Sequence, residues 1–304
     1  MKIILAEHYG VCFGVRDAIV RAEKAAKTGP LTILGELVHN PIVRERLARA
    51  GVGEGDLGDF SGAVGTVMIT AHGASDAAQE IWRQTGRTVI DGACPLVRHA
   101  HTQLRQLVDA GFSPVIIGKR GHVEVNGLAG DFPDVFIVEC AADLPDLPPR
   151  SRYGVISQTT QPIEYVRELV ATLKLVRPES EVHFVDTVCQ PTKNRQSALQ
   201  KLLTEAETIV VVGGRNSNNT RQLAAAVAAA GRRALHIERA EELQDDWFCG
   251  VEVVGVTAGT STLKETVASV YERLQQIGAA REGAHPLLNG EVARGQETPV
   301  FAHQ

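Results

Sequence analysis

Three cysteines stand at equivalent points of a repeated sequence pattern. Cys12, Cys94 and Cys189 each follow a short apolar run, an acidic residue and a turn. Pro95 directly after Cys94 is typical of the first position of a helix, so we expect this cysteine where a strand ends and a helix begins. At such a junction the helix dipole and the free N–H groups favour a thiolate. Three thiolates that converge would bind a metal centre.

Hydrogen-bonding residues recur in register with these cysteines. A polar residue follows each cysteine by 27 or 28 residues, four positions beyond a glycine that ends an apolar run: His39, His122 and Ser217. The next apolar run of each unit ends in a second polar cluster, which contains His72, Thr159 with Thr160, or Ser261. Together with Asn219 these side chains form a ring of donors. Each hydrogen bond to an ionised oxygen is worth roughly 1.5–3 kcal/mol, so the ring could bind a diphosphate without a cluster of lysines.

Glu124 lies two residues after His122. A glutamate at the start of a helix is commonly a solvated residue that the helix dipole favours. Beside a metal centre, a carboxyl group with a histidine neighbour is also a suitable proton donor. Both interpretations are kept at this point.

The remaining cysteines lack such a pattern. Cys140 at the end of an apolar run and Cys249 in Asp-Trp-Phe-Cys-Gly are expected to be small buried apolar side chains. The other seven histidines are expected to be ordinary core or surface residues.

Two metal centres are compatible with three cysteines. Zinc would take a fourth ligand from His39, His72 or His122. An iron–sulfur cluster would leave one iron open to a substrate. We favour the cluster, because the three histidines have a better use as donors to an anion.

The elements that position these residues alternate between strands and helices, which predicts an α/β fold with parallel sheets. Strands are expected at 2–6, 31–34, 66–69, 89–90, 114–117, 135–138, 153–156, 182–185, 208–212, 233–237 and 251–257. Helices are expected at 14–27, 41–50, 76–84, 95–110, after His122, and at 162–175, 193–205, 220–230 and 263–277. The segment 51–63 is expected to be a loop, and the strand at 89–90 to be buried.

The repeat predicts three similar α/β lobes around a pseudo-three-fold axis with a central iron–sulfur cluster. Lobe 1 covers residues 12–94, lobe 2 covers 95–188, and lobe 3 covers 189–277 together with 1–11. The last lobe lacks a closing strand of its own, so we expect residues 2–6 to fill that place. Residues 278–304 are rich in glycine, alanine and proline, and are expected to be an arm or loose tail.

Composition excludes several classes of protein. The chain of 304 residues carries a net charge of −5 and only 5% aromatic residues, which argues against nucleic-acid binding. There is no apolar run long enough for a membrane span and no signal-peptide pattern, which predicts a cytoplasmic protein with reduced thiols. Five widely spread cysteines do not suggest a disulfide framework, and no Walker-type phosphate loop is present.

Several motifs of the chain resemble the 4-hydroxy-3-methylbut-2-enyl diphosphate reductase family. They extend over residues 1 to about 277 and include Gly-Val-Cys12-Phe-Gly-Val, Gly-Glu-Leu-Val-His39-Asn, Ala-His72-Gly, Ala-Cys94-Pro-Leu-Val, Gly-His122-Val-Glu124-Val, Ser-Gln-Thr159-Thr160, Cys189-Gln-Pro-Thr192-Lys-Asn-Arg-Gln, Asn-Ser217-Asn-Asn219 and Val-Thr-Ala-Gly-Thr-Ser261.

The resemblance implies a site and a reaction. A [4Fe-4S] cluster would be ligated by Cys12, Cys94 and Cys189, and Glu124 would be the proton source, helped by the hydroxyl of Thr192. The substrate diphosphate would be held by His39, His72, His122, Thr159, Ser217, Asn218, Asn219 and Ser261. The reaction would be a two-electron reductive dehydration of this allylic diphosphate to isopentenyl and dimethylallyl diphosphates. An external ferredoxin or flavodoxin would supply the electrons.

The chain departs from the family pattern at two places. His8-Tyr9 replaces the usual Pro-Arg before the first cysteine, and Asn218 stands where the family usually has serine. Two alternatives therefore stay open: a paralogue with the same chemistry on another allylic alcohol, and a non-enzymatic scaffold held together by zinc on cysteine and histidine ligands.

Overall fold

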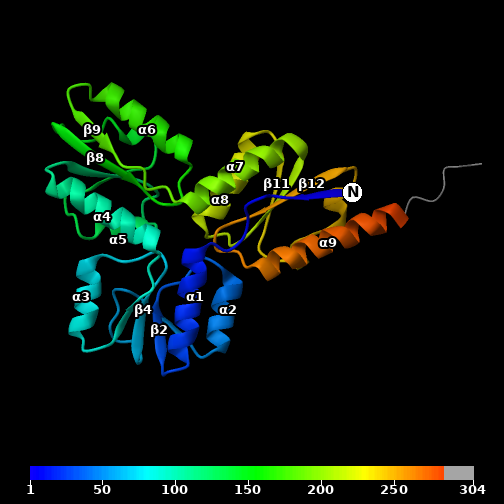
Figure 1. Cartoon of the computed structure of the whole chain (residues 1–304), viewed down its shortest axis with the longest axis horizontal. Coiled ribbons are helices and arrows are strands. Elements are labelled where there is room, and N and C mark those ends of the chain that lie inside the picture. The colour runs from blue at the N-terminus through cyan, green and yellow to red at the C-terminus, as the bar shows by residue number, and fades with distance from the viewer. Residues whose placement is uncertain (284–304) are drawn as a thin grey trace, which may run out of the picture.

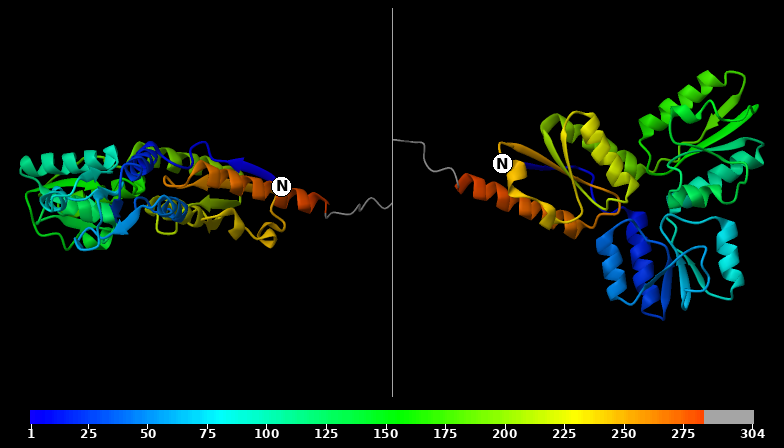
Figure 2. Two further views of the ribbon diagram at one scale, coloured as in Figure 1. Left: turned by 90° about the horizontal axis from the view of Figure 1, so that it is seen from below. Right: turned by 180° about the vertical axis from the view of Figure 1, so that it is seen from behind.

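A computed structural model describes residues 1–283 of the chain. Three lobes lie side by side, each built on one four-stranded parallel sheet with helices on both faces (Figure 1). The side view shows that the lobes form a single flattened layer (Figure 2). The predicted fold class of three similar α/β lobes is confirmed.

Lobe 1 has the sheet order β3-β2-β4-β5. Its strands are β2 (Leu31–Leu34), β3 (Gly53–Gly55), β4 (Thr66–Ile69) and β5 (Val89–Asp91). Its helices are α1 (Phe13–Ala26), α2 (Pro41–Arg49) and α3 (Asp76–Gln84).

Lobe 2 has the equivalent order β7-β6-β8-β9. Its strands are β6 (Ser113–Ile117), β7 (Phe136–Val138), β8 (Arg152–Ser157) and β9 (Glu181–Phe184). Its helices are α4 (Pro95–Asp109), α5 (Val123–Ala129), the 3₁₀ turn η1 (Ala141–Asp143) and α6 (Ile163–Val176).

Lobe 3 has the order β1-β12-β10-β11, which is the same arrangement written from the other edge. Its strands are β1 (Lys2–Leu5), β10 (Thr208–Val212), β11 (Arg233–Ile237) and β12 (Val253–Ala258). Its helices are α7 (Gln190–Glu205), α8 (Asn218–Ala229), the 3₁₀ turns η2 (Ala240–Glu242) and η3 (Asp245–Phe248), and α9 (Lys264–Gly283).

The N-terminal strand completes the lobe formed by the C-terminal third of the chain. β1 pairs in parallel with β12, with Lys2 opposite Val253 and Leu5 opposite Val256. β1 thus takes the edge position that β5 and β9 take in the other lobes, as the sequence predicts. Each candidate cysteine therefore follows the closing strand of a sheet.

Each sheet is covered by apolar side chains on both faces. In lobe 1, Ile33 and Met68 pack with the α1 and α2 residues, whereas Val67 and Ile69 pack on the other face with Trp82 of α3. This alternation follows from the two-residue period of a strand. The buried sheets hold their carboxyl ends rigidly, which is where ligands bind in such folds.

Three of the differences from the prediction have a clear physical reason. The segment 51–63, expected as a loop, contains β3, which pairs with β2 through its backbone; its Gly-Glu-Gly sequence has no apolar pattern to reveal it. β5 is only half-buried, because it is an edge strand with one neighbour. α7 begins at Gln190 rather than at residue 193, since Pro191 is tolerated in the first helical turn.

The predicted start of the C-terminal arm or tail, residue 278, is wrong. α9 continues past residue 277 to Gly283, so residues 278–283 belong to the helix. The rest of the predicted tail, 284–304, lies outside the described residues.

Cys140 and Cys249 are exposed, not buried as expected. Cys140 precedes the surface turn η1 and Cys249 follows η3, so neither side chain points into a sheet core. No helix within residues 1–283 combines the length and apolar character that a membrane crossing requires.

Candidate active site

The three cysteines are fixed by the same backbone contact in each lobe. Cys12, Cys94 and Cys189 are the N-cap residues of α1, α4 and α7. The backbone N–H of each donates to a carbonyl just beyond the neighbouring strand: Thr260 (3.0 Å), Ala71 (3.0 Å) and Thr159 (2.9 Å). The predicted strand-to-helix position is therefore confirmed for all three cysteines.

The thiols share one interior environment. Burial raises the pKa of Cys94, and although N–H groups of its own helix oppose this, the charges of Cys12 and Glu124 add to it. Burial likewise raises the pKa of Cys189 to about 11, with Thr192 opposing and with the same two charges adding. Charges act in this way only over short distances, so the structure brings these four groups to one place.

Gly14 of α1 lies directly against the sulfur of Cys94. A Cβ atom on this glycine would stand 2.3 Å from Cys94 Sγ. The close approach joins the first turn of α1 in lobe 1 to the second cysteine. Glycine is required here because a side chain would collide with this sulfur, and not because of the backbone conformation.

A single metal ion does not fit the cysteines as they stand. Zinc–sulfur bonds of about 2.3 Å place tetrahedral sulfurs roughly 3.8 Å apart. Within residues 1–283, one set of three histidine, cysteine or acidic side chains has all its ligand atoms within 4.8 Å of one another, and this set contains no cysteine. The geometry therefore disfavours the alternative of a zinc ion on three cysteines and a histidine.

Arg195 of α7 is a buried cation beside two of the thiols. It donates from Nη1 to Pro191 O (2.7 Å) and from Nη2 to Gly10 O. Burial lowers its pKa, while the charges of Cys12 and Cys189 oppose that shift. A buried positive charge at this point would stabilise anionic sulfur ligands.

The three predicted histidines form a compact cluster. The ring centroids of His39 and His72 are 4.4 Å apart, and His122 lies 5.6 Å from His39 and 5.5 Å from His72. These are the residues whose ligand nitrogens lie within 4.8 Å of one another. His72 Nε2 is shielded from solvent and has no hydrogen-bond partner within the described part of the chain.

Neighbouring groups fix the roles of the ring nitrogens. His39 Nδ1 lies 2.8 Å from Glu36 Oε2, which leaves its Nε2 for a ligand. His122 Nδ1 accepts the N–H of Glu124 (3.1 Å) and caps α5, so the neutral ring carries its proton on Nε2. Burial, His39 and the cations Lys119 and Arg221 lower the pKa of His122 to about 4.

His72 is also held neutral. Burial lowers its pKa well below the ordinary value, and the charges of His39 and His122 lower it further. The cluster without a ligand thus consists mainly of neutral rings that can donate hydrogen bonds. An anion bound among them would reverse the pKa shifts.

Glu124 is buried and held by one partner residue. Its Oε1 accepts the Thr159 N–H (2.6 Å) and its Oε2 accepts the Thr159 hydroxyl (3.1 Å). Burial raises its pKa to about 7, although both Thr159 bonds oppose this shift. The expected alternative of a solvated helix-start glutamate is wrong, since only 2% of the residue is exposed.

Two further predicted residues, Asn218 and Ser261, lie at junctions between lobes. Asn218 Nδ2 donates to Thr160 Oγ1 (2.9 Å), which connects lobe 3 to lobe 2. The Ser261 hydroxyl donates to His39 O (3.2 Å), and Asn40 Nδ2 donates to Ser261 O (2.6 Å), which connects lobe 3 to lobe 1. The junctions therefore keep the polar loops of all three lobes in contact.

Three other predicted side chains have separate local contacts. Ser217 caps α8 by accepting from Thr220 N (3.3 Å), and Asn219 Oδ1 accepts from Thr260 N (3.1 Å). Asn219 Nδ2 is buried and has no partner among the described residues. Thr192 places its hydroxyl 3.1 Å from Cys189 Sγ, whereas the hydrogen bonds of Glu124 come from Thr159.

Comparison with known proteins places the chain in a family. The family model described as LytB protein matches residues 3–275. The chain belongs to this family. A relative from Aquifex aeolicus (strain VF5), named 4-hydroxy-3-methylbut-2-enyl diphosphate reductase, is 37% identical over 283 residues, which cover 91% of this chain and 97% of the relative. A relative from Geobacter sulfurreducens with the same name is 37% identical over 93% of this chain and 100% of its own.

Solved structures with reductase titles share the LytB fold of this chain. The E-1-hydroxy-2-methyl-but-2-enyl-4-diphosphate reductase from Plasmodium falciparum matches with a TM-score of 0.84 at 28% identity, covering 90% of this chain and 88% of that one. A second structure, titled (E)-4-hydroxy-3-methyl-but-2-enyl diphosphate reductase, the terminal enzyme of the non-mevalonate pathway, matches with a TM-score of 0.66 at 35% identity. This match covers 91% of this chain and 100% of that one.

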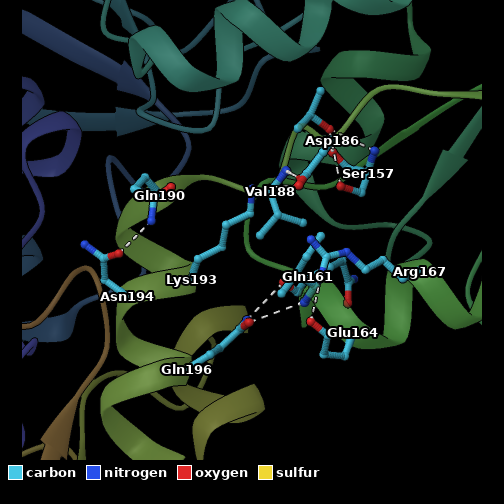
Figure 3. A network of polar contacts seen from close by, with 12 residues as sticks. Ser157, Gln161, Glu164, Arg167, Asp186, Val188, Gln190, Lys193, Asn194 and Gln196 are labelled. Atoms are coloured by element: carbon cyan, nitrogen blue, oxygen red, sulfur yellow. Dashed lines mark hydrogen bonds and ion pairs between the residues drawn. The ribbon is translucent and has the colours of Figure 1, made fainter.

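Within this LytB fold, one side chain supports the site from outside. Gln196 of α7 donates from Nε2 to Gln161 O (3.1 Å) and accepts from Ile163 N (3.3 Å), as Figure 3 shows. Lys193 on the same helix pairs with Asp186 (2.8 Å). The Gln196 contacts hold α7, which begins after Cys189, against the loop that follows Thr159 and Thr160. The Lys193 ion pair holds the same helix against the segment before Cys189.

The sequence analysis did not identify Glu36, Arg195 and Gln196 as parts of the site. All three stand inside motifs quoted above, so their position in those motifs was the available signal. Glu36 pairs with His39 only three residues away. Arg195 reaches Gly10 and Gln196 reaches Gln161, and a sequence pattern does not show these distant contacts.

Proposed function

We propose that this chain is a [4Fe-4S]-dependent reductase that converts 4-hydroxy-3-methylbut-2-enyl diphosphate to isopentenyl and dimethylallyl diphosphates. The names of its relatives support this substrate. The observation that carries the proposal is the pairing of two adjacent groups of side chains. The charge of the buried, protonatable Glu124 acts on two of the three cysteine N-caps, Cys94 and Cys189. A cluster of three histidines begins two residues away at His122.

The residues present fit the cluster. Three thiols stand at three helix N-termini, and within residues 1–283 they are not among the side chains whose ligand atoms gather closely enough for a single ion. Three cysteines can instead hold an iron–sulfur cluster. Gly14 leaves room for the sulfur of Cys94, and Arg195 supplies a buried positive charge. Cys12, Cys94 and Cys189 would hold the group, which when bound would pass two electrons to the substrate from an external donor of the ferredoxin or flavodoxin type.

The substrate head group would occupy the histidine cluster. His122 donates from Nε2, and His72 offers an unpartnered Nε2. His39 contacts Glu36 through Nδ1, which leaves its Nε2 for the ligand. Thr159, Ser217, Asn218, Asn219 and Ser261 would complete the donor set from the loops of lobes 2 and 3. Asn219 Nδ2 is a buried donor without an acceptor among the described residues, and a phosphate oxygen would serve as that acceptor.

The chemistry needs two electrons and two protons, breaks one carbon–oxygen bond and releases water. Glu124 would protonate the leaving hydroxyl, since a pKa of about 7 keeps a proton available at neutral pH. Thr159 holds the carboxyl in place through both oxygens. Thr192 would assist from beside Cys189.

Anaerobic purification followed by assay tests the proposal. We expect a coloured protein with about four iron and four sulfide per chain that reduces the diphosphate when given a strong one-electron donor. Cys94→Ser should lose or disorder the cluster. A colourless, folded and zinc-loaded protein would contradict the cofactor. A loaded protein that leaves this diphosphate unchanged would contradict the substrate and favour a paralogue.

A further inference from the structure

A cavity of about 560 Å³ lies between lobe 2 and lobe 3, outside the histidine cluster. Lobe 2 contributes Lys119 and Gln161, and lobe 3 contributes Asn218 and Arg221 of α8. Its volume lies within the range of about 300–1,000 Å³ that is typical of sites for small ligands. Nothing in the proposed reaction uses this cavity.

Two cations of the cavity wall have no counter-charge. Within residues 1–283, neither the Lys119 ammonium nor the Arg221 guanidinium forms an ion pair or hydrogen bond. The adjacent Arg120, in contrast, forms ion pairs with Glu139 (3.2 Å) and Asp143 (3.0 Å). Glu139, the one carboxylate of the wall, is thus already engaged, which leaves the cavity with a net positive charge.

The cavity adjoins the loops that carry the proposed head-group site. Asn218 lines the cavity and also donates to Thr160, which is next to Thr159. Lys119 lies three residues before His122, and its N–H donates to Gln158 Oε1 (3.1 Å) in the loop that holds Thr159. The charges of Lys119 and Arg221 reach the His122 ring, where they contribute to its low pKa.

We propose that this cavity is an outer binding site for a diphosphate, in which Lys119 and Arg221 capture the anionic head group before it passes to the histidines. The inference rests on the proposed function for the identity of the substrate. Two free cations at the mouth of a polar site raise the local concentration of an anion and its rate of association. In this arrangement the two cations attract the anion. The histidines, which are mostly neutral when empty, then orient it through hydrogen bonds.

The test compares the double variant Lys119→Gln/Arg221→Gln with wild-type holoenzyme at low and high ionic strength. We expect KM for the diphosphate substrate to rise about tenfold at low salt with kcat within about twofold, and the difference to shrink to about twofold near 0.5 M salt. Calorimetric titration with inorganic pyrophosphate should show a similar loss of affinity at low salt. Both side chains are exposed, so the variant should fold like the wild type.

Two controls make the comparison specific. Lys27→Gln/Lys174→Gln removes the same charge from exposed cations elsewhere and should leave KM and pyrophosphate affinity unchanged. The swap Lys119→Arg/Arg221→Lys keeps both charges and should behave like the wild type. A double Gln variant that matches the Lys27/Lys174 control at low salt would overturn the outer site.

The outcomes separate this inference from the proposed function. A wild-type protein that binds pyrophosphate through Lys119 and Arg221 but does not reduce the diphosphate would support the outer site and contradict the reaction. A wild-type protein that reduces the diphosphate, with the double variant unaffected, would support the reaction and overturn the outer site.

Discussion

Both carboxylate oxygens of Glu124 accept hydrogen bonds from Thr159, a residue 35 positions away, just beyond the end of β8 in lobe 2. The same Thr159 accepts the N–H of Cys189 on its carbonyl (2.9 Å). One residue therefore joins the buried carboxyl to the backbone of a candidate metal ligand. This arrangement fixes Glu124 relative to the thiols without exposing it to solvent.

Replacing Glu124 by glutamine should leave the cluster in place and remove most of the turnover. Glutamine keeps the size and one acceptor for Thr159, but it cannot release a proton. We expect kcat to fall by about 10²–10⁴-fold, the usual contribution of a positioned proton donor. Iron content and visible spectrum, measured on the same sample, should match the wild type. A glutamine variant with wild-type kcat would show that Glu124 is not the proton source.

The pH dependence of kcat should report the titration of the same carboxyl group, that of Glu124. The pKa of Glu124 is raised from 4.5 to about 7, mainly by burial, so the carboxyl holds its proton below about pH 6 and loses it as the pH rises through about 7. Turnover should therefore decline on the alkaline side, since the protonated form is the active one. Steady-state kcat between about pH 5.5 and 9 measures it, and a kcat that increases through this range would contradict the assignment.

The repeat predicted where the cysteines and the N-terminal strand lie, because each unit has the same backbone arrangement. Cys12, Cys94 and Cys189 occupy the same N-cap position with the same N–H contact, so recognising one unit located all three. The pairing of β1 with β12 followed from a missing closing strand, which is a property of the pattern. What repeats in the sequence was therefore predictable.

The rest depends on contacts that break the repeat. Arg195 reaches the carbonyl of Gly10, which is 185 residues away, and no equivalent contact exists in the other two units within residues 1–283. Gly53–Gly55 forms a strand through backbone pairing alone, without side chains that reveal it. The burial of Glu124 depends on how lobe 2 packs, and this decided between the two interpretations that the sequence left open.

Diphosphate binding should be accompanied by proton uptake at His72 and His122. The empty cluster is mostly neutral, because His72 and His122 have lowered pKa values, about 4 for His122. A bound anion favours protonated imidazole, so the complex binds more protons than the free protein, and affinity should rise as the pH falls from about 7 toward 4.

Calorimetry of inorganic pyrophosphate binding in buffers of different ionisation enthalpy measures this proton uptake. Glu36→Gln replaces the carboxylate 2.8 Å from His39 Nδ1 that orients this ring, and should reduce the affinity by about tenfold. Glu80→Gln, on an exposed face of α3, is the matched control. Affinity that increases with pH would contradict the neutral state of the empty histidines.

Adding one methyl group at Gly14 should remove the cluster and spare the fold. The new Cβ would stand 2.3 Å from Cys94 Sγ and 3.1 Å from Cys94 Cβ, so the cysteine must rotate its sulfur away. Gly14 is a residue of α1, where alanine is favoured over glycine by about 1 kcal/mol. Thermal stability of the metal-free Gly14→Ala protein should thus stay equal or rise, while iron per chain falls by half or more. Gly278→Ala in α9 is the control, because its Cβ would meet Met1 at an ordinary 3.6 Å, and it should keep the iron. Full iron loading of Gly14→Ala would mean that Cys94 does not hold the metal in the conformation described here.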